Sequence, residues 1–270
     1  MAHNYYLHRG GEDAVFETEM KALERAGHEV VPVVFSNDVL ENVSAFQKLS
    51  YACWNQASFC EMRRSIRAFK PQVVHVHSFS FTLSPSVFSA CKAEQVPVVQ
   101  TLHNYRPMCA NAILFRDGKV CTDCVGKSAA WLGISRKCYH NSALASAGVV
   151  ATQIGGRIAG VYPGLVDRFI CLTEFARDLY IKHGFPKEKL RVKPNFVPDP
   201  PSFFRAPNSR CCYVGRITRE KGLPNLLDAW TAMRGDHALD VIGDGPIAGA
   251  LRQRFASHPN INFLGQLNKP

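Results

Sequence analysis

Residues 210–222 read RCCYVGRITREKG, a short apolar run that changes into a loop rich in glycine and charge. The run RCCYV predicts a buried strand, and a helix is predicted over residues 223–233. Between them the loop follows the pattern G-R-x4-K-G. Gly215 leaves space beside the backbone, and Arg216 and Lys221 place positive charge near the N-terminus of the helix. This strand–loop–helix arrangement favours an anion site that suits a diphosphate, with a solvated basic turn as the alternative.

A second loop of this kind follows the next apolar run, ALDVI, at residues 238–242. It contains Gly243, Asp244 and Gly245, and Pro246 comes next. The glycines permit a tight turn, and proline suits the first turn of a helix. Two anion-ready loops at neighbouring strand ends indicate a phosphate-containing ligand more specifically than either loop alone.

The same alternation of strand and helix extends along the whole chain. The predicted strands cover residues 29–35, 72–77, 97–102, 168–172, 190–193, 210–214, 238–242 and 260–264. The predicted helices cover residues 13–26, 57–69, 84–94, 142–161, 174–182, 223–233 and 247–256. The alternation predicts βαβ units and mostly parallel sheets, and therefore an α/β fold of doubly wound domains.

The composition changes at residues 194–207, where PNFVPDPPSFFRAP contains five of the 16 prolines. Such a segment fits neither a helix nor a central strand, so it reads as a semi-rigid linker. We predict a first domain over residues 1–195, a linker over 196–208 and a shorter second domain over 209–270.

Length and charge narrow the class of protein. The 270 residues are 46% hydrophobic and 20% charged, which excludes a disordered or collagen-like chain. The formal net charge of +10 predicts an anionic partner: a nucleotide, a phosphorylated or lipid-linked sugar, a membrane surface or nucleic acid. The N-terminus lacks the pattern of a signal peptide, and ten cysteines are too few for a disulfide scaffold. We therefore predict a cytoplasmic protein, and the charge leaves peripheral contact with the inner face of the membrane open.

Candidate ligand-binding residues also occur in the first domain. Gly10 and Gly11 precede a predicted helix, where they allow a close backbone approach to a ligand or simply make a tight turn. His103 follows the strand PVVQTL, and His75 and His77 end the preceding strand, so the three approach one sheet edge. A histidine at this edge can bond sugar hydroxyls or move protons, although a lone histidine is more often structural.

The segment 103–141 is too long for an ordinary α/β connection and contains four cysteines. Their spacing is C-x11-C-x2-C-x13-C. One reading is a structural zinc site that orders the insertion; the other is four buried thiols without a metal. The candidate ligands are Cys109, Cys121, Cys124 and Cys138.

These loops resemble the donor-binding domain of GT-B glycosyltransferases of family 4, which carries G-R-x-x-x-x-K-G and G-x-G-P elements. The first domain is similar to that family in Gly10-Gly11-Glu12, His103-Asn104 and Pro194-Asn195. The segment LFRDG at residues 114–118 resembles a bacterial subgroup associated with surface polysaccharide assembly. The resemblance covers nearly the whole chain and implies two Rossmann-like domains.

The resemblance implies a retaining transfer of a sugar from a nucleotide-diphosphate donor to a carbohydrate or polyprenyl-phosphate-linked acceptor, with no cofactor required for the chemistry. Arg216 and Lys221 would bind the donor diphosphate. Gly11 would approach the donor phosphate or the acceptor, and His103 would contact the transferred sugar. The remaining donor-side residues would be Gly215, Gly243, Asp244 and Gly245.

The family pattern also continues beyond this sequence. The family's second domain reaches an E-x7-E element, which is missing before Pro270, and a full apolar strand usually precedes the equivalent of His3-Asn4. We therefore expect a fragment with an incomplete second domain, and an inactive one is among the expectations.

Two alternative functions stay open at this point. One is a nucleotide-sugar epimerase that shares the GT-B architecture. The other is a zinc-containing, basic protein that binds nucleic acid, which is less favoured because the strand-end loops would then have no purpose. It would use the cationic residues around the cysteines, namely Arg106, Arg116, Lys119, Lys127, Arg136 and Lys137.

Overall fold

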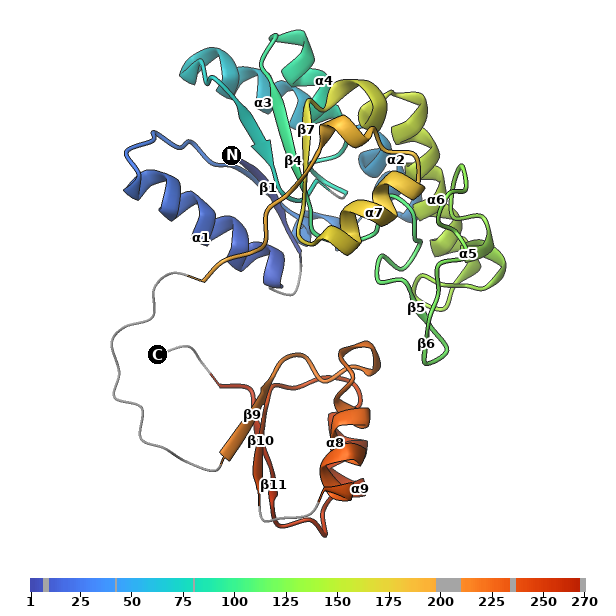
Figure 1. Ribbon diagram of the computed structural model, residues 1–270. Helices are drawn as coiled ribbons and strands as arrows, with labels where there is room; N and C mark the ends of the chain where they lie inside the picture. Colours follow the sequence, from blue (N-terminus) through green and yellow to red (C-terminus); the bar gives the residue numbers. More distant parts are fainter. Residues whose placement is uncertain (7–9, 42, 80, 198–209, 234–236, 268–270) are drawn as a thin grey trace. The chain divides into compact units, whose positions relative to one another are not determined.

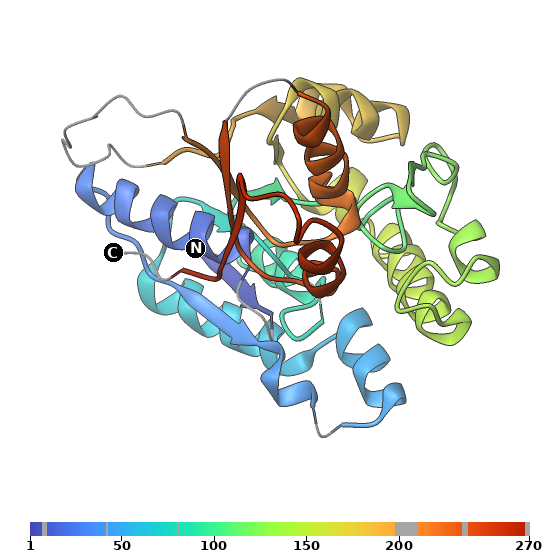
Figure 2. The ribbon, with the colours of Figure 1, turned by 90° about the horizontal axis from the view of Figure 1, so that it is seen from below.

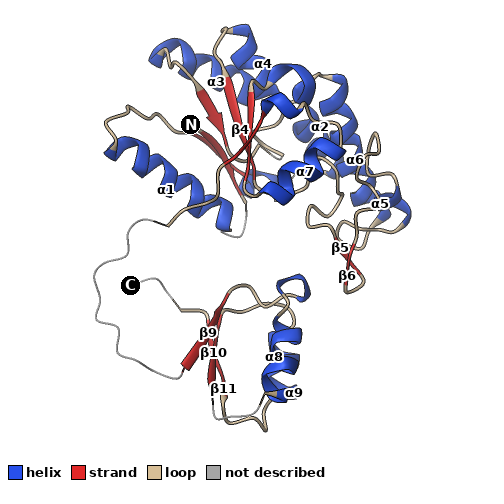
Figure 3. Ribbon diagram, viewed as in Figure 1, coloured by secondary structure: helices blue, strands red, loops and turns tan. Residues whose placement is uncertain are grey.

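The computed structural model describes residues 1–6, 10–41, 43–79, 81–197, 210–233 and 237–267. The chain divides into two compact units, one of residues 1–114 and 121–200 and the other of residues 115–120 and 201–270. Each unit contains a parallel sheet packed with helices (Figures 1 and 3), so the α/β fold class is confirmed. The predicted linker over 196–208 lies outside the described residues except for Phe196 and Val197, so its boundaries stay a prediction.

The first unit has a six-stranded sheet in the order β2-β1-β3-β4-β7-β8, in which every recorded pairing is parallel. Because the strands are parallel, their carboxyl ends share one edge, where ligands bind in open α/β sheets. The strands are β1 (Ala2–Tyr5), β2 (Val33–Ser36), β3 (Val74–Val76), β4 (Val98–Leu102), β7 (Arg168–Cys171) and β8 (Leu190–Val192).

Helices of the first unit lie on both faces of this sheet (Figure 1). They are α1 (Gly11–Arg25), α2 (Ala45–Cys53), α3 (Gln56–Phe69), α4 (Ser86–Ala93), α5 (Leu132–Ser135), α6 (Ala143–Ile158) and α7 (Glu174–Lys182). The short α5 and the longer α6 lie together at one side of the unit (Figures 1 and 2). Among the described residues, no helix combines the length and the apolar character that crossing a membrane requires.

The described part of the chain also contains several short elements. The antiparallel hairpin of β5 (Phe115–Arg116) and β6 (Lys119–Val120) lies within the predicted insertion. A π-helical turn covers Val161–Leu165. Single 3-10 turns cover Asn37–Leu40, Lys187–Lys189 and Arg219–Lys221.

The strand β1 was not among the predicted strands, because its sequence AHNY is largely polar. In the structure it pairs with both β2 and β3, and His3 and Asn4 are fully buried. Their side chains find partners in the core: the Nε2 of His3 lies 2.7 Å from Asp13 Oδ1, and Asn4 Nδ2 donates to Asn37 Oδ1 at 2.9 Å. Buried polar groups are tolerated when they are paired in this way.

The second unit has a three-stranded parallel sheet in the order β11-β10-β9. Its core consists of fully buried aliphatic side chains that include Leu223, Leu227, Leu239 and Val241. The strands are β9 (Arg210–Val214), β10 (Ala238–Ile242) and β11 (Ile261–Gly265), and the helices are α8 (Leu223–Ala232) and α9 (Ala248–Arg254).

Candidate functional site

Two histidines meet at the carboxyl edge of the first sheet, as the sequence predicts. His77 follows β3 and His103 follows the neighbouring strand β4. The Nδ1 of His77 lies 3.1 Å from the Nε2 of His103, and their ring centroids are 5.2 Å apart. The structure therefore holds the ring of His103 in place through its neighbour.

Burial keeps both rings neutral at neutral pH. Desolvation lowers the pKa of His103 to about 4, and the nearby His3 and Lys193 act in the same direction. Burial likewise lowers the pKa of His77, with help from His75. A neutral imidazole can accept or donate one hydrogen bond to a sugar hydroxyl, but it supplies no positive charge.

The two glycines of the first unit lie at the start of α1. Gly10 is the N-cap and Gly11 is the first helical residue, two positions earlier than predicted. The N–H of Gly10 donates to Asp13 Oδ2 at 2.8 Å. A Cβ atom at either glycine would meet nothing within 4 Å, so packing within the chain does not require glycine here. Open space at this helix start is compatible with the predicted approach of a ligand.

A buried carboxylate beside the histidines was not among the predicted site residues. Asn104, the residue after His103, donates from Nδ2 to Glu12 Oε1 at 2.9 Å. Burial raises the pKa of Glu12. These three residues line a small cavity of about 30 Å³ together with His77 and Arg106. The sequence feature that could have indicated this residue is its position directly after Gly10 and Gly11.

In the second unit, the loop after β9 carries the predicted cations at the start of α8. The side chain of Arg216 is 67% exposed, and its Nη2 lies 3.5 Å from Glu220 Oε1. Lys221 is also exposed, and its ammonium makes no ion pair within the part of the chain that the structure describes. Gly222 has φ +74° and caps α8, so this turn favours glycine. The loop thus presents two exposed cations at a helix N-terminus.

The glycines of the second loop pack against the first loop. A Cβ atom on Gly243, which has φ +135°, would lie 2.0 Å from the carbonyl oxygen of Gly215. A Cβ atom on Gly245 would lie 2.3 Å from the carbonyl oxygen of Ile217. The Oδ1 of Asp244 accepts the N–H of Gly245 at 2.8 Å. Close backbone packing therefore explains both glycines, and their contact with a nucleotide stays a prediction.

The four cysteines of the insertion are all half-buried and free of disulfides. Cys124 and Cys138 pack beside a small apolar cluster, and the Sγ of Cys109 donates to Asn111 Oδ1 at 2.8 Å. Zinc at these thiols stays a prediction. Among the described residues, the potential metal ligands whose donor atoms lie within 4.8 Å of one another are instead Glu19, His75 and His77.

The basic residues around the cysteines are partly neutralised. Arg116 forms an ion pair with Asp117, and Arg136 forms one with Asp123. The guanidinium of Arg106 lies over the ring of Tyr139 and donates to the carbonyl of Ala110. These pairings reduce the exposed positive charge that a nucleic-acid surface would need.

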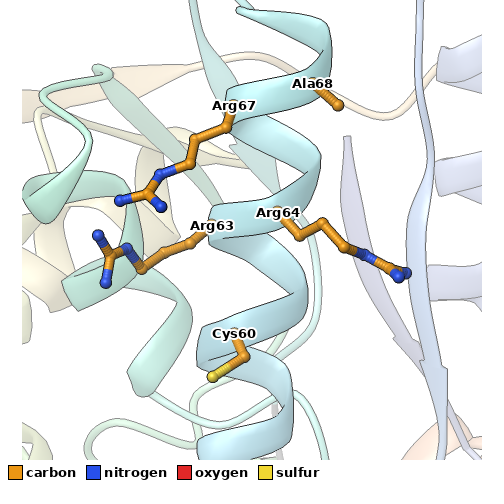
Figure 4. Close-up of a pocket in the computed structure, with 5 residues that line it drawn as sticks. All are labelled: Cys60, Arg63, Arg64, Arg67 and Ala68. Carbon is orange, nitrogen blue, oxygen red and sulfur yellow. The ribbon is translucent and has the colours of Figure 1, made fainter.

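A larger hollow of about 540 Å³ lies on the outer face of α3 (Figure 4). Figure 4 shows Arg63 and Arg67 pointing to one side of the helix and Arg64 to the other. The first two bind the carboxylate of Glu94 at 2.5 and 3.0 Å, and Arg64 binds Glu61 at 2.6 Å. Because its guanidinium groups are paired in this way, the hollow is a less suitable candidate for an anion site than the loop after β9.

The sequence is similar to a known protein family and to two known proteins. A family model described as Glycosyltransferase Family 4 matches residues 9–199. Two Escherichia coli proteins, the O-antigen biosynthesis glycosyltransferase WbnH and the probable O-antigen biosynthesis glycosyltransferase WbiN, are each 27% identical to the chain over 127 residues. The match covers 42% of the chain and 36% of each relative, so it spans about a third of the length of these relatives.

Solved structures support the fold. Anabaena HepE in complex with UDP has a TM-score of 0.56 and 12% identity, covering 98% of this chain and 68% of HepE. The apo form of the lipopolysaccharide outer core galactosyltransferase WaaB has a TM-score of 0.51 and 12% identity, covering 99% of this chain and 69% of WaaB. At these identities the likeness shows the fold alone.

Proposed function

Because the chain belongs to glycosyltransferase family 4, we propose that it transfers a sugar from a nucleotide-diphosphate donor to a carbohydrate or lipid-linked acceptor. The family match over residues 9–199 carries this proposal. The relatives WbnH and WbiN are named for O-antigen biosynthesis, which supports a role in assembling a surface polysaccharide.

The second unit would bind the donor. Arg216 and Lys221 are exposed cations at the start of α8, where the positive end of the helix dipole also attracts anions. HepE, which shares the fold, was solved with UDP, and this makes UDP a sensible first ligand. The packing of Gly243 and Gly245 against the first loop would fix the shape of this site.

The first unit would bind the sugar and the acceptor. His103 lies at the carboxyl edge of the sheet with a neutral imidazole held by His77. Its other ring nitrogen, Nδ1, would bond a hydroxyl of the transferred sugar. Gly11 would let the acceptor or the donor phosphate come close to the start of α1.

We propose a retaining reaction, as the family resemblance implies. The acceptor hydroxyl forms a new bond to the anomeric carbon while the bond from that carbon to the diphosphate breaks. The hydroxyl proton passes to the departing diphosphate oxygen. Arg216 and Lys221 would stabilise the negative charge that develops on this leaving group.

Product analysis tests the proposal. Purified protein is incubated with UDP-sugars, with and without oligosaccharide or polyprenyl-phosphate-linked acceptors, and the products are identified by mass spectrometry and NMR. The expected result is a glycosylated acceptor with retained anomeric configuration and release of UDP. An epimerised nucleotide sugar formed without acceptor would contradict the proposal, and so would the absence of transfer to every acceptor.

A further inference from the structure

A buried group of two histidines and one glutamate lies between α1 and β3 in the first unit. His75 and His77 are two residues apart on β3 and its end, so they point to the same side. Glu19 reaches them from α1. The Nδ1 of His75 lies 3.7 Å from Glu19 Oε1, and the Nε2 of His77 lies 3.7 Å from Glu19 Oε2. The three side chains are at most 12% exposed.

The second nitrogen of each ring is held by another residue. The Nε2 of His75 lies 2.8 Å from Thr101 Oγ1, and the Nδ1 of His77 lies 3.1 Å from His103 Nε2. The opposite nitrogens therefore face the carboxylate. The Nε2 of His77 is fully buried, and within the described part of the chain it has no hydrogen-bond partner. A buried, unpaired nitrogen directed at a carboxylate requires an explanation, because such groups are costly.

We propose that Glu19, His75 and His77 bind a divalent metal ion such as zinc. Two imidazoles and one carboxylate are a common donor set for such ions. Bonds of about 2.0–2.2 Å in a tetrahedral site place the donor atoms roughly 3.3 Å apart. The two nitrogen–oxygen separations of 3.7 Å, one to each oxygen of Glu19, need to shorten by a few tenths of an ångström, and the three ligand atoms all lie within 4.8 Å of one another. The bonds to Thr101 and His103 would orient the rings, as outer partners do in metal sites.

Lys193 competes with the metal for the same carboxylate. Its Nζ lies 3.1 Å from Glu19 Oε2, and its side chain is 39% exposed. A partly exposed ammonium can move to solvent at little cost, whereas the histidines are fixed in the core. We therefore expect metal binding to displace Lys193, and removal of this ammonium to strengthen metal binding.

The inference goes beyond the proposed glycosyltransferase reaction and does not depend on it. A metal here would tie α1 to β3 and, through His77, fix the orientation of His103. Binding can be measured with the metal ion alone, without donor or acceptor. Failure of this inference would leave the donor site untouched, and failure of the donor site would leave the metal site untouched.

The test measures zinc bound by the full chain after treatment with a chelator. Wild type is compared with Glu19→Gln and His77→Ala, and with His28→Ala as a matched control, because His28 is an exposed histidine of the same unit. Zinc affinity and bound equivalents come from equilibrium dialysis with elemental analysis. A Cys121→Ser/Cys124→Ser variant separates any zinc that the thiols bind.

We expect the Glu19→Gln and His77→Ala variants to lose one equivalent of bound zinc, or to bind that zinc at least 10-fold more weakly. The His28→Ala variant should bind as much zinc as wild type, with the same affinity. Lys193→Met should bind zinc several-fold more tightly. Zinc should also raise the Tm of wild type but not of Glu19→Gln, a conservative variant that guards against misfolding of His77→Ala. Equal zinc binding by wild type and both site variants would overturn the inference, as would zinc that is lost only with the cysteines.

Discussion

The Nδ1 of His77 lies 3.1 Å from the Nε2 of His103, and this contact joins the ends of the neighbouring parallel strands β3 and β4. Burial lowers the pKa of both rings, so one nitrogen donates and the other accepts at neutral pH. That contact uses the Nε2 of His103, and within the described residues the Nδ1 on the other side of the ring makes no hydrogen bond to the protein. The ring of His103 is thus oriented on one side and available to a ligand on the other.

Replacing this histidine should slow sugar transfer without affecting the binding of UDP. For His103→Ala we expect kcat to fall by about 2–10-fold, which corresponds to the loss of one neutral hydrogen bond of roughly 0.5–1.5 kcal/mol in the transition state. Steady-state transfer assays and UDP titrations measure the two properties separately. His28→Ala, at an exposed position, should leave both unchanged. Wild-type kcat in His103→Ala would contradict the assigned contact.

The close packing of the loops that follow β9 and β10 predicts a large loss of stability for any side chain at Gly243. The new Cβ atom would lie 2.0 Å from the carbonyl oxygen of Gly215, and φ is +135°. We expect Gly243→Ala to lower the free energy of unfolding by about 2–5 kcal/mol, from backbone strain and overpacking together. Urea denaturation followed by fluorescence measures this change.

Gly249 provides the matched control for that substitution. It lies in α9 of the same unit, and an added Cβ atom would meet nothing within 4 Å. Gly249→Ala should therefore be neutral or stabilising by up to about 1 kcal/mol, because alanine favours the helix. Similar destabilisation by both substitutions would show that the loop contact is not the cause.

The stability of the first unit should fall as the pH decreases from about 6.5 to 4. Burial and the nearby Arg157 lower the pKa of His183 to about 4. Its Nδ1 accepts the N–H of Gly126 at 3.1 Å, and Arg157 Nη2 lies 2.9 Å from its Nε2. Between these pH values the unfolded chain binds a proton that the folded chain excludes. The stabilisation is therefore complete above pH 6.5 and is lost toward pH 4.

Denaturation at pH 7.0, 6.0 and 5.0 tests this dependence. A buried histidine whose pKa is lowered in this way changes the free energy of unfolding by at most roughly 1.4 kcal/mol per pH unit. His183→Gln keeps a hydrogen-bonding side chain but cannot titrate, so its stability should fall less steeply than that of wild type. Identical slopes for the two proteins would refute the assignment to His183.

The hydrogen bond made by the hydroxyl of Tyr180 predicts a moderate contribution to stability. The Oη of Tyr180 donates to the carbonyl oxygen of Asn104 at 2.5 Å and so fastens the segment that follows His103. Tyr180→Phe should lower the free energy of unfolding by about 1–2 kcal/mol, because a partly buried carbonyl loses its hydrogen-bond donor. Tyr139→Phe is a suitable control, since that ring is only half-buried. An unchanged midpoint for Tyr180→Phe would argue against this anchoring role.

Local patterns were sufficient to predict most of the fold. The helix α7 has the predicted bounds, Glu174–Lys182, because Thr173 caps it and a turn follows. The helix α2 was missed, although Ser44 and Gln47 form a capping box at its start. The predicted strand 29–35 proved to be Val33–Ser36, since Pro32 has no N–H to donate to a ladder.

The sites were predictable only where neighbouring strands bring their ends together. His77 and His103 follow adjacent strands, so their meeting follows from the parallel sheet. The position of Glu19 beside the histidines depends on how α1 packs over the sheet, and this packing cannot be predicted from the local sequence. The contact between Gly243 and Gly215 joins two separate loops, so the sequence predicted a tight turn at Gly243 and Gly245 but not its packing against the first loop.

The binding of UDP tests the central claim that the loop after β9 holds the donor diphosphate. Calorimetric titration would compare wild type with Arg216→Ala/Lys221→Ala. The control Arg252→Ala/Arg254→Ala removes the same charge from the last turn of α9. We predict that the loop variant binds UDP at least about 10-fold more weakly, since charged hydrogen bonds are lost, while the control stays within twofold. Equal affinity in all three proteins, or no binding by wild type at millimolar UDP, would contradict the account.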